Sequence, residues 1–458
     1  MIQPQGRIRW THPSVRQLAG DRDPLDVIVT RARDVALQAQ EDGWSGPPYD
    51  PVELARLLNI DVQPREDVRD ARTVPIGRNR VRIEFNPDRP GGRTRYSLAH
   101  EVAHTFFPDV AERVRNRAHR GEMSGDEWQL EMLCNVAAAE LLMPIGSFPE
   151  LHDEQLSIER LLDRRRQFQV STEAVLIRAI RLTDQPVAMF AAAPIDRVTT
   201  SMPRYRIDYT LASRTFAGRV PVGTRLPVNT SVAECTAIGF TARGKEQWPR
   251  MRSAVTIECV GIPPYPDHVL PRVVGLVRTD DEPTSVTPRI EYVLGDATQP
   301  RGAGPHVVAH VVNDRTPNWG GPFARAVRDR WPRAQQDFRE WVEDDRSRLS
   351  LGATRVCDVT DDTCVFTMIS QKGYGPSRGP RIRYVALETC LRSLSGEARR
   401  RNASVHMPAI GCGEAGGRWE VVQELIDNAL CRNGLRVLVY RLPGRPDPTR
   451  SAEPTLFS

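Results

Sequence analysis

The stretch His100-Glu101-Val102-Ala103-His104 decides how this chain is interpreted, because it places two histidines four residues apart with a glutamate beside the first. On an α-helix such histidines lie about 40° apart around the axis, so both imidazoles can face one metal ion. Zinc lowers the pKa of a bound water to roughly 7, and Glu101 is close enough to accept its proton. The stretch predicts a zinc peptidase centre, although short motifs of this kind also occur on ordinary surface helices.

The residues before this motif predict a strand and a turn. Residues 81–85 alternate between apolar and polar side chains, and the cluster rich in proline and glycine at 86–92 ends the strand. We expect the helix that carries the motif to begin near Tyr96. A catalytic zinc site also needs a third protein ligand and one position open to water.

The third ligand must come from farther along the chain. Phe107 and Val110 stand where a metzincin would have its glycine and third histidine. Residues 127–143 have a helical pattern that contains Glu131 and Glu140. Nine residues correspond to about 180° around a helix, so only one of these two carboxylates can face the metal. We take Glu131 as the ligand.

These two segments together resemble the ImmA/IrrE metallopeptidases, whose pattern is A-H-E-x-x-H followed by E-x-x-A-N-x-F-A-A-E-L-L-M-P. Residues 99–104 match the first part, and residues 131–144, EMLCNVAAAELLMP, match most of the second. Cys134 and Ala137 replace the alanine and phenylalanine of the pattern, which loosens packing but changes no ligand. The resemblance covers roughly residues 50–182. It implies that Glu131 is the third zinc ligand and that the substrate is a helix-turn-helix repressor, cut once under stress.

The last third of the chain, from Ile290 to about Leu442, alternates strand-like and helical runs, which predicts an α/β domain. Glycine-bearing loops at 318–323 and 411–419 each follow a strand and precede a helix. Glycine lets backbone N–H groups approach a phosphate, and a helix N-terminus adds a positive dipole end, so two such loops suit a diphosphate. A single glycine loop is more often a tight turn. The expected strands lie at 306–312, 365–369, 405–408 and 437–440, and the expected helices at 322–331 and 384–398.

Four segments of this region together resemble a macro domain, a fold that binds ADP-ribose: 295–298, 313–314, 319–324 and 407–413. The resemblance implies that Asp296 holds the adenine amino group, with Ala297 also at the ligand, and that Asn313 lies near the distal ribose. The loop residues that it places around the diphosphate and distal ribose are Gly320, Gly321, Phe323, Gly411, Cys412, Gly413, Glu414 and Ala415.

The loop pattern is most similar to the terminal ADP-ribose glycohydrolase type, which uses a lysine nucleophile and an acid. Ala415 stands where that type has its catalytic aspartate, and either Gln371 or Lys372 occupies the lysine position, depending on a gap. The chain has only two lysines, Lys245 and Lys372. A lysine can act as a nucleophile and an arginine cannot, which favours a role for Lys372, with chance retention as an equal explanation. We expect an ADP-ribose reader, with ADP-ribosyl hydrolysis through Lys372 as the alternative.

Two segments between the sites say less about function. Residues 157–182 are helical and rich in arginine, with Ser171 as an N-cap. They fit either a DNA-binding helix-turn-helix or a helix pair packed on the peptidase core, and we favour packing. Residues 187–277 hold short β-type runs separated by Pro and Gly, which predicts a β-rich domain that serves as a spacer or a ligand sensor. These runs are 204–209, 236–240, 255–260 and 273–277.

The predicted fold class is multi-domain α/β. A mainly helical zincin-like peptidase domain covers 1–185, a β-rich middle domain 186–278, a linker 279–289, an α/β/α macro domain 290–445 and a flexible tail 446–458. No signal peptide and no apolar run long enough for a membrane span is visible, which predicts a cytoplasmic protein. The net charge of +5 is modest and the acidic residues are interspersed with arginine, so the charge by itself does not indicate nucleic-acid binding. The eight cysteines contain no C-x-x-C pair, so neither a disulfide framework nor a cysteine zinc site is indicated.

The two motif-bearing regions together predict a zinc-dependent endopeptidase coupled to an ADP-ribose-binding domain. Its partners would be a protein substrate, such as a transcriptional repressor, and ADP-ribose or an ADP-ribosylated target. The alternative is an ADP-ribosyl hydrolase with a regulatory peptidase half.

Overall fold

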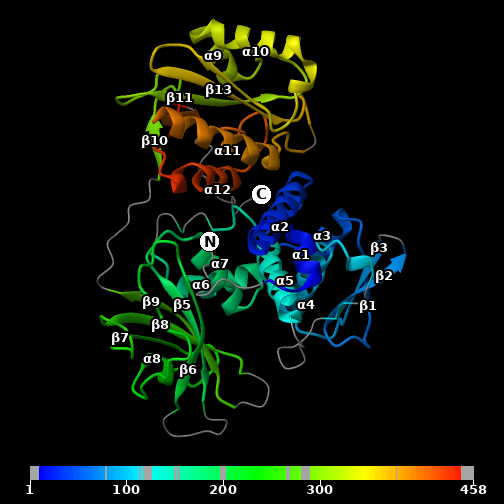
Figure 1. Ribbon diagram of the computed structural model, residues 1–458, viewed down its shortest axis with the longest axis vertical. Coiled ribbons are helices and arrows are strands. Elements are labelled where there is room, and N and C mark those ends of the chain that lie inside the picture. Colours follow the sequence, from blue (N-terminus) through cyan, green and yellow to red (C-terminus); the bar gives the residue numbers. More distant parts are fainter. Residues whose placement is uncertain are drawn as a thin grey trace. The chain divides into compact units, whose positions relative to one another are not determined.

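The structure is a computed structural model of the chain, in which two compact units are described separately (Figure 1). One unit comprises Met1–Arg33, Ser45–Met143 and Glu150–Val286, and the other Asp34–Trp44, Pro144–Pro149 and Thr287–Ser458. The predicted linker, apart from its two end residues, and the predicted tail lie outside the described residues. None of the described helices is long and apolar enough to cross a membrane. The described residues are 10–77, 80–112, 115–116, 126–148, 151, 155–195, 203–264, 269–279, 289–377 and 379–444.

The first unit opens with helices and a four-stranded mixed sheet of order β1-β3-β2-β4. Strand β1 pairs with β3 in parallel, and β2 pairs with β3 and β4 in antiparallel fashion. Helix α2, Pro24–Glu41, begins in this unit and ends in the other. The remaining elements are α1 Pro13–Ala19, α3 Pro51–Leu57, β1 Asp61–Pro64, β2 Ala71–Gly77, β3 Arg80–Phe85, α4 Gly91–His104, a 3-10 turn Val110–Glu112, β4 Arg115–Asn116 and α5 Glu127–Leu142.

Helix α4 begins earlier than the sequence predicts, at Gly91 rather than near Tyr96. The backbone N–H groups of Arg93 and Thr94 both donate to the Pro90 carbonyl, at 2.8 and 3.0 Å, which closes a first turn containing both glycines. Arg93 also pairs with Asp70 at 2.6 Å. These contacts offset the poor helix propensity of glycine, so the turn cluster ends sooner than expected.

The helix pair α6 and α7 forms where the sequence predicts it, at Ile158–Phe168 and Thr172–Leu182. Ser171 caps α7, because its hydroxyl accepts the Ala174 N–H at 3.1 Å. Helix α7 contacts both α5 and strands of the middle sheet, where Glu173 pairs with Arg272 at 2.8 Å. The pair is therefore packed on two sides, in agreement with the packing interpretation.

The middle of the chain is a five-stranded antiparallel sheet of order β6-β5-β9-β8-β7. The sequence analysis does not predict strand β5, because this strand is buried throughout and shows no alternation of apolar and polar residues. The predicted β-type run at 236–240 is wrong: this segment turns through Gly239 at φ +83°, and β7 begins only at Thr241. The elements are β5 Ala188–Pro194, β6 Tyr205–Ala212, α8 Ser231–Glu234, β7 Thr241–Glu246, β8 Val255–Ile262 and β9 Arg272–Thr279.

The second unit is built on a six-stranded sheet of order β10-β15-β14-β11-β13-β12, parallel except for the β12–β13 pair. Helices α9 and α10 cover one face and α11 and α12 the other, which gives the predicted α/β/α layers (Figure 1). The elements are β10 Ile290–Leu294, β11 His306–Asn313, α9 Pro322–Arg330, α10 Pro332–Asp344, β12 Thr354–Asp358, β13 Thr363–Gln371, α11 Tyr384–Arg401, β14 Ser404–Pro408, α12 Trp419–Ala429 and β15 Val437–Arg441, with 3-10 turns Arg346–Arg348 and Cys431–Asn433.

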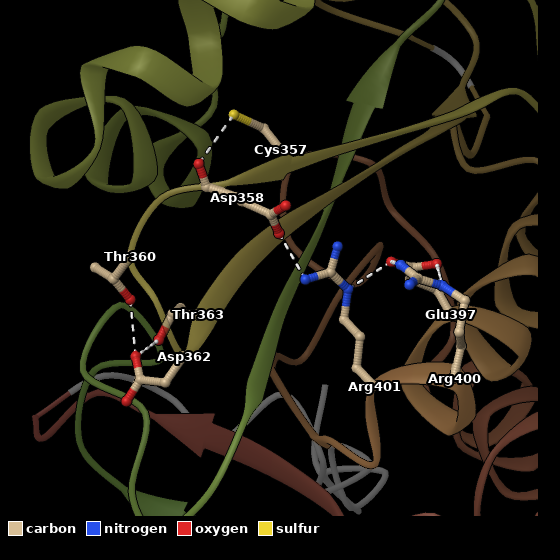
Figure 2. Close-up of polar contacts among 8 residues, drawn as sticks. All are labelled: Cys357, Asp358, Thr360, Asp362, Thr363, Glu397, Arg400 and Arg401. Carbon is tan, nitrogen blue, oxygen red and sulfur yellow. Dashed lines mark hydrogen bonds and ion pairs between the residues drawn. The ribbon is translucent and has the colours of Figure 1, made fainter.

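Polar contacts fasten the antiparallel edge of this sheet to the end of α11 (Figure 2). Arg401 pairs with Asp358 at 2.6 Å and with Glu397 at 2.5 Å. In the β12–β13 turn, Asp362 accepts the hydroxyl of Thr363 at 3.0 Å. The edge strand is thereby held at the end opposite to the loops that follow β11 and β13.

Candidate functional site

Two histidines and one glutamate converge where α4 packs on α5. His100 Nε2 lies 3.1 Å from Glu131 Oε2, and His104 Nε2 lies 3.5 Å from Glu131 Oε1. Both histidines are fully buried and Glu131 is 5% exposed. Two imidazole nitrogens and a carboxylate brought together away from water form a donor set that suits zinc.

The other ring nitrogens are held by residues from α5. His100 Nδ1 lies 3.0 Å from Asn135 Oδ1, which also accepts the hydroxyl of Tyr96 at 2.7 Å. His104 Nδ1 lies 3.4 Å from Cys134 Sγ. When the Nδ1 atoms carry the protons, they donate to Asn135 and Cys134, and the Nε2 lone pairs face Glu131. Such outer contacts orient metal-binding histidines.

A different donor set, His100, His104 and Cys134, also brings its ligand atoms within 4.8 Å of one another. The two sets differ in which nitrogens they use. Cys134 lies at the Nδ1 side of His104, whereas Glu131 lies at the Nε2 atoms of both rings. The set with Glu131 is therefore the more favourable one, because both histidines can bind one ion without turning their rings.

Glu101 is the remaining polar residue of the motif and is fully buried. Its Oε2 accepts the hydroxyl of Thr73, on β2, at 2.8 Å. This hydrogen bond comes from an element that the sequence did not connect with the site. It fixes the orientation of a carboxylate that directly follows His100 in the helix.

Glu140 belongs to a separate buried ion pair. Its carboxylate lies 2.6 Å from Arg178 Nη1 and 3.6 Å from Arg181 Nη1. Arg178 Nε also donates to the Met143 carbonyl at 2.8 Å. The structure thus gives Glu140 a partner on α7 and does not bring it to the histidines.

The predicted ADP-ribose residues lie at the carboxyl ends of parallel strands in the second unit, the edge where open α/β sheets bind ligands. Asp296 follows β10, Asn313 ends β11, and the loop from Gly411 follows β14. The two glycine loops approach each other, since a Cβ added to Gly321 would lie 3.9 Å from Glu414 Oε2. A Cβ at Gly320 or Gly413 would meet nothing within 4 Å, so the backbone there is open to a ligand.

Several of these residues also hold the loops in shape. Asp296 Oδ1 accepts the Thr298 N–H at 2.8 Å, and Asn313 Oδ1 accepts the Arg315 N–H at 2.9 Å. Phe323 is half-buried against a small cluster that contains Ala297. Cys412 is partly buried, and burial raises the pKa of its thiol to about 12. It is therefore a neutral side chain at neutral pH.

Lys372 lies on a loop tied to the second glycine loop. The backbone N–H of Arg381 donates to the Ala415 carbonyl at 2.7 Å, and the Lys372 N–H donates to the Arg381 carbonyl at 2.8 Å. The Lys372 side chain is exposed, whereas Gln371 Nε2 donates to the Gly373 carbonyl at 3.0 Å. The structure thus places Lys372 next to the loop, and Ala415 supplies no acid there.

Sequence reasoning missed a histidine that supports the first glycine loop. His310 is buried in β11, with Nε2 2.9 Å from Thr367 Oγ1 and its ring centroid 4.5 Å from that of Trp319. Burial lowers the pKa of His310 to about 3, so the ring is neutral. Trp319 directly precedes Gly320. The signal was a histidine flanked on both sides by apolar residues within the strand, which indicates a buried contact but not its partner.

Comparison with known proteins identifies both regions. Residues 58–179 match the family model of the IrrE N-terminal-like domain, Peptidase_M78. A solved macrodomain protein from Streptomyces coelicolor is 39% identical, over 33% of this chain and 99% of that chain, with a TM-score of 0.30.

Two curated proteins are similar over a comparable share of the chain. The ADP-ribose 1''-phosphate phosphatase of Lodderomyces elongisporus is 26% identical over 150 residues, 30% of this chain and 91% of that protein. The mouse chromodomain-helicase-DNA-binding protein 1-like is 30% identical over 165 residues, 34% of this chain. The match spans only 18% of the mouse protein's length. The chain thus contains a region, residues 58–179, that matches the IrrE-like domain of the Peptidase_M78 family, and a region similar to macrodomain proteins.

Proposed function

We propose that the chain is a zinc-dependent endopeptidase whose macrodomain binds ADP-ribose or an ADP-ribosylated target. One observation carries the peptidase assignment. The Nε2 atoms of His100 and His104 lie 3.1 and 3.5 Å from the carboxylate of Glu131, while the Nδ1 atoms are engaged on their other side. With both Nδ1 atoms protonated, the two Nε2 atoms and the carboxylate bring only lone pairs together, and a bound cation satisfies all three.

Each residue has a distinct part in the proposed reaction. His100, His104 and Glu131 hold zinc, which when bound supplies Lewis-acid activation of water. Glu101 accepts a proton from the attacking water and delivers it to the leaving amine. The Thr73 hydroxyl donates to Glu101 Oε2 and keeps the carboxylate in place for both transfers.

The proposed substrate is a regulatory protein such as a helix-turn-helix repressor, as the IrrE-like family implies. The macrodomain recruits the peptidase to ADP-ribosylated partners or gates cleavage in response to ADP-ribose. This part of the proposal is supported by two facing glycine loops at the carboxyl ends of β11 and β14, and by the similarity to a phosphatase named for an ADP-ribose compound. Coupling of the two activities rests on their presence in one chain.

A second candidate function is hydrolysis of ADP-ribosyl groups by the macrodomain. The favouring observation is that Lys372 lies on a loop bonded through Arg381 to Ala415 in the second glycine loop. The absence of an acid at position 415 weighs against it. Release of ADP-ribose that stops in Lys372→Ala would support this second function.

The proposed peptidase is tested by comparing the wild type with Glu101→Gln. The amide keeps the shape of the side chain but accepts no proton, so we expect zinc content to be unchanged and cleavage to fall by at least a hundredfold. Labelling of new protein N-termini in cells that express each variant gives the substrates and cut sites. An identical set of N-termini in both cells would refute the peptidase proposal.

A further inference from the structure

Two cysteines of the middle sheet face each other, and neither belongs to the sites described above. Cys235 follows the short helix α8, and Cys259 lies on β8. Their sulfur atoms are 3.6 Å apart, and both side chains are fully buried.

Backbone contacts hold the two sulfurs in register. Gly261, on the same strand as Cys259, accepts the Gly239 N–H at 2.8 Å and donates to the Phe240 carbonyl at 2.9 Å. A Cβ added at Gly261 would come within 2.1 Å of the Ala237 carbonyl oxygen. Only glycine lets the segment after Cys235 lie so close to the strand. The contact between the thiols is therefore fixed by the main chain on both sides.

The two thiols are also chemically unequal. The hydrogen bond from Cys259 lowers the pKa of Cys235 and raises the pKa of Cys259. By contrast, burial raises the pKa of Cys364 and of Cys390 to about 12. The two sulfurs lie 3.6 Å apart, so once one thiol is oxidised the other is in place to attack it, and the lowered pKa of Cys235 favours this residue as the first to react.

We propose that Cys235 and Cys259 form a peroxide-oxidisable pair that closes to a disulfide within the middle sheet. The Cys235 thiolate attacks hydrogen peroxide, the O–O bond breaks, and the products are a sulfenic acid and hydroxide, which is protonated to water. The Cys259 sulfur then attacks the sulfenic sulfur, an S–S bond forms, and a second water leaves with the Cys259 proton. Two thiols lose two electrons in total, and one peroxide becomes two waters.

The distance between the two sulfurs is only slightly longer than a disulfide bond requires. A disulfide requires sulfurs about 2.05 Å apart, so the pair must approach by roughly 1.5 Å. Because both sulfurs are buried, the proposal requires peroxide to enter by a local opening, and the turn after Cys235 is the exposed segment nearest in sequence, with Ile238 62% and Phe240 51% exposed. Closure would covalently link α8 to β8 and enclose β7, the strand at the sheet's edge.

The test uses the full-length protein, first reduced, then treated with hydrogen peroxide and alkylated under denaturing conditions. Mass spectrometry of the digest should show one peptide pair joined through Cys235 and Cys259, while Cys364 and Cys390 remain alkylated. In Cys259→Ser, Cys235 should stop at the sulfenic acid, which a cyclic dione traps. In the control Cys390→Ser, the joined pair should form as in the wild type.

Two results would overturn the proposal. One is complete alkylation of both cysteines in wild-type protein at peroxide concentrations that already oxidise its methionines. The other is a Cys235 disulfide to any cysteine other than Cys259. Because the wild type alone decides both, the outcome does not depend on whether a variant folds.

Discussion

At the scale of single residues, the choice between two glutamates is the sharpest question. Glu131→Gln should lose zinc, because the carboxylate that faces both histidines is replaced by a weaker ligand. Glu140→Gln should keep zinc but destabilise the fold by about 3–5 kcal/mol, since Arg178 would be left buried without its charged partner. Metal analysis of both variants measures the zinc content, and denaturant unfolding measures the change in stability. Zinc retained in Glu131→Gln and lost in Glu140→Gln would reverse the assignment.

Cys134 has two possible roles at the zinc site: it is either the hydrogen-bond partner of His104 Nδ1 or a metal ligand. As a partner, it should raise zinc affinity, and Cys134→Ala should weaken binding by about tenfold in a chelator competition. The control Cys390→Ala removes a buried thiol from the macrodomain core and should leave affinity unchanged. A thiolate-to-cobalt absorption band in the cobalt-loaded wild type, absent from Cys134→Ala, would show instead that sulfur binds the metal.

The sequence predicts residues whose relation is local and misses those whose relation is not. His100, Glu101 and His104 lie within one turn and a half of helix, so spacing alone brings them together. Thr73 reaches Glu101 from a strand 28 positions earlier, and no pattern in the sequence links them. Cys134 was noticed only as a departure from a family pattern. Its contact with His104 depends on how α4 packs against α5.

Helices and strands with strong hydrophobic periodicity and clear capping residues are predicted close to their observed positions. Helix α5 and the strands β11 and β14 lie within a few residues of their predicted positions. The two failures concern β-type segments: β5 is an all-apolar strand without alternation, and the turn at Gly239 interrupts a run with β propensity. In both cases tertiary packing decides where the strand lies.

The N-terminus of α11 gives a prediction about pH. Glu41 accepts the Tyr384 N–H at 2.5 Å, and burial raises its pKa to about 7 although Arg383 opposes the shift. The folded state then holds a proton that the unfolded state releases near pH 4.5, so this group makes stability fall as pH rises from 4.5 to 7. Glu41→Gln should remove that decline. Thermal unfolding of both proteins across this range measures it, and parallel curves would contradict the assignment.

At the scale of the whole molecule, the described contacts follow compact units rather than the order of the sequence. Residues Asp34–Trp44 and Pro144–Pro149 belong to the unit that contains the macrodomain, where Leu37 and Ile145 join its core. Sequence patterns identified both functional regions and their order. They could not identify these short segments, because their apolar residues look the same whichever core they enter. The boundaries predicted from the sequence remain a prediction.

We propose that one chain carries both a zinc site and an ADP-ribose site. Calorimetric titration of the full-length protein with ADP-ribose, with zinc measured on the same sample, tests it most directly. Gly413→Glu should fill the open loop and abolish binding, while Gly396→Glu, at an exposed position on α11, should not. We predict micromolar binding, lost only in Gly413→Glu, with about one zinc per chain. Zinc-loaded protein that binds no ADP-ribose, or binding without zinc, would contradict the claim.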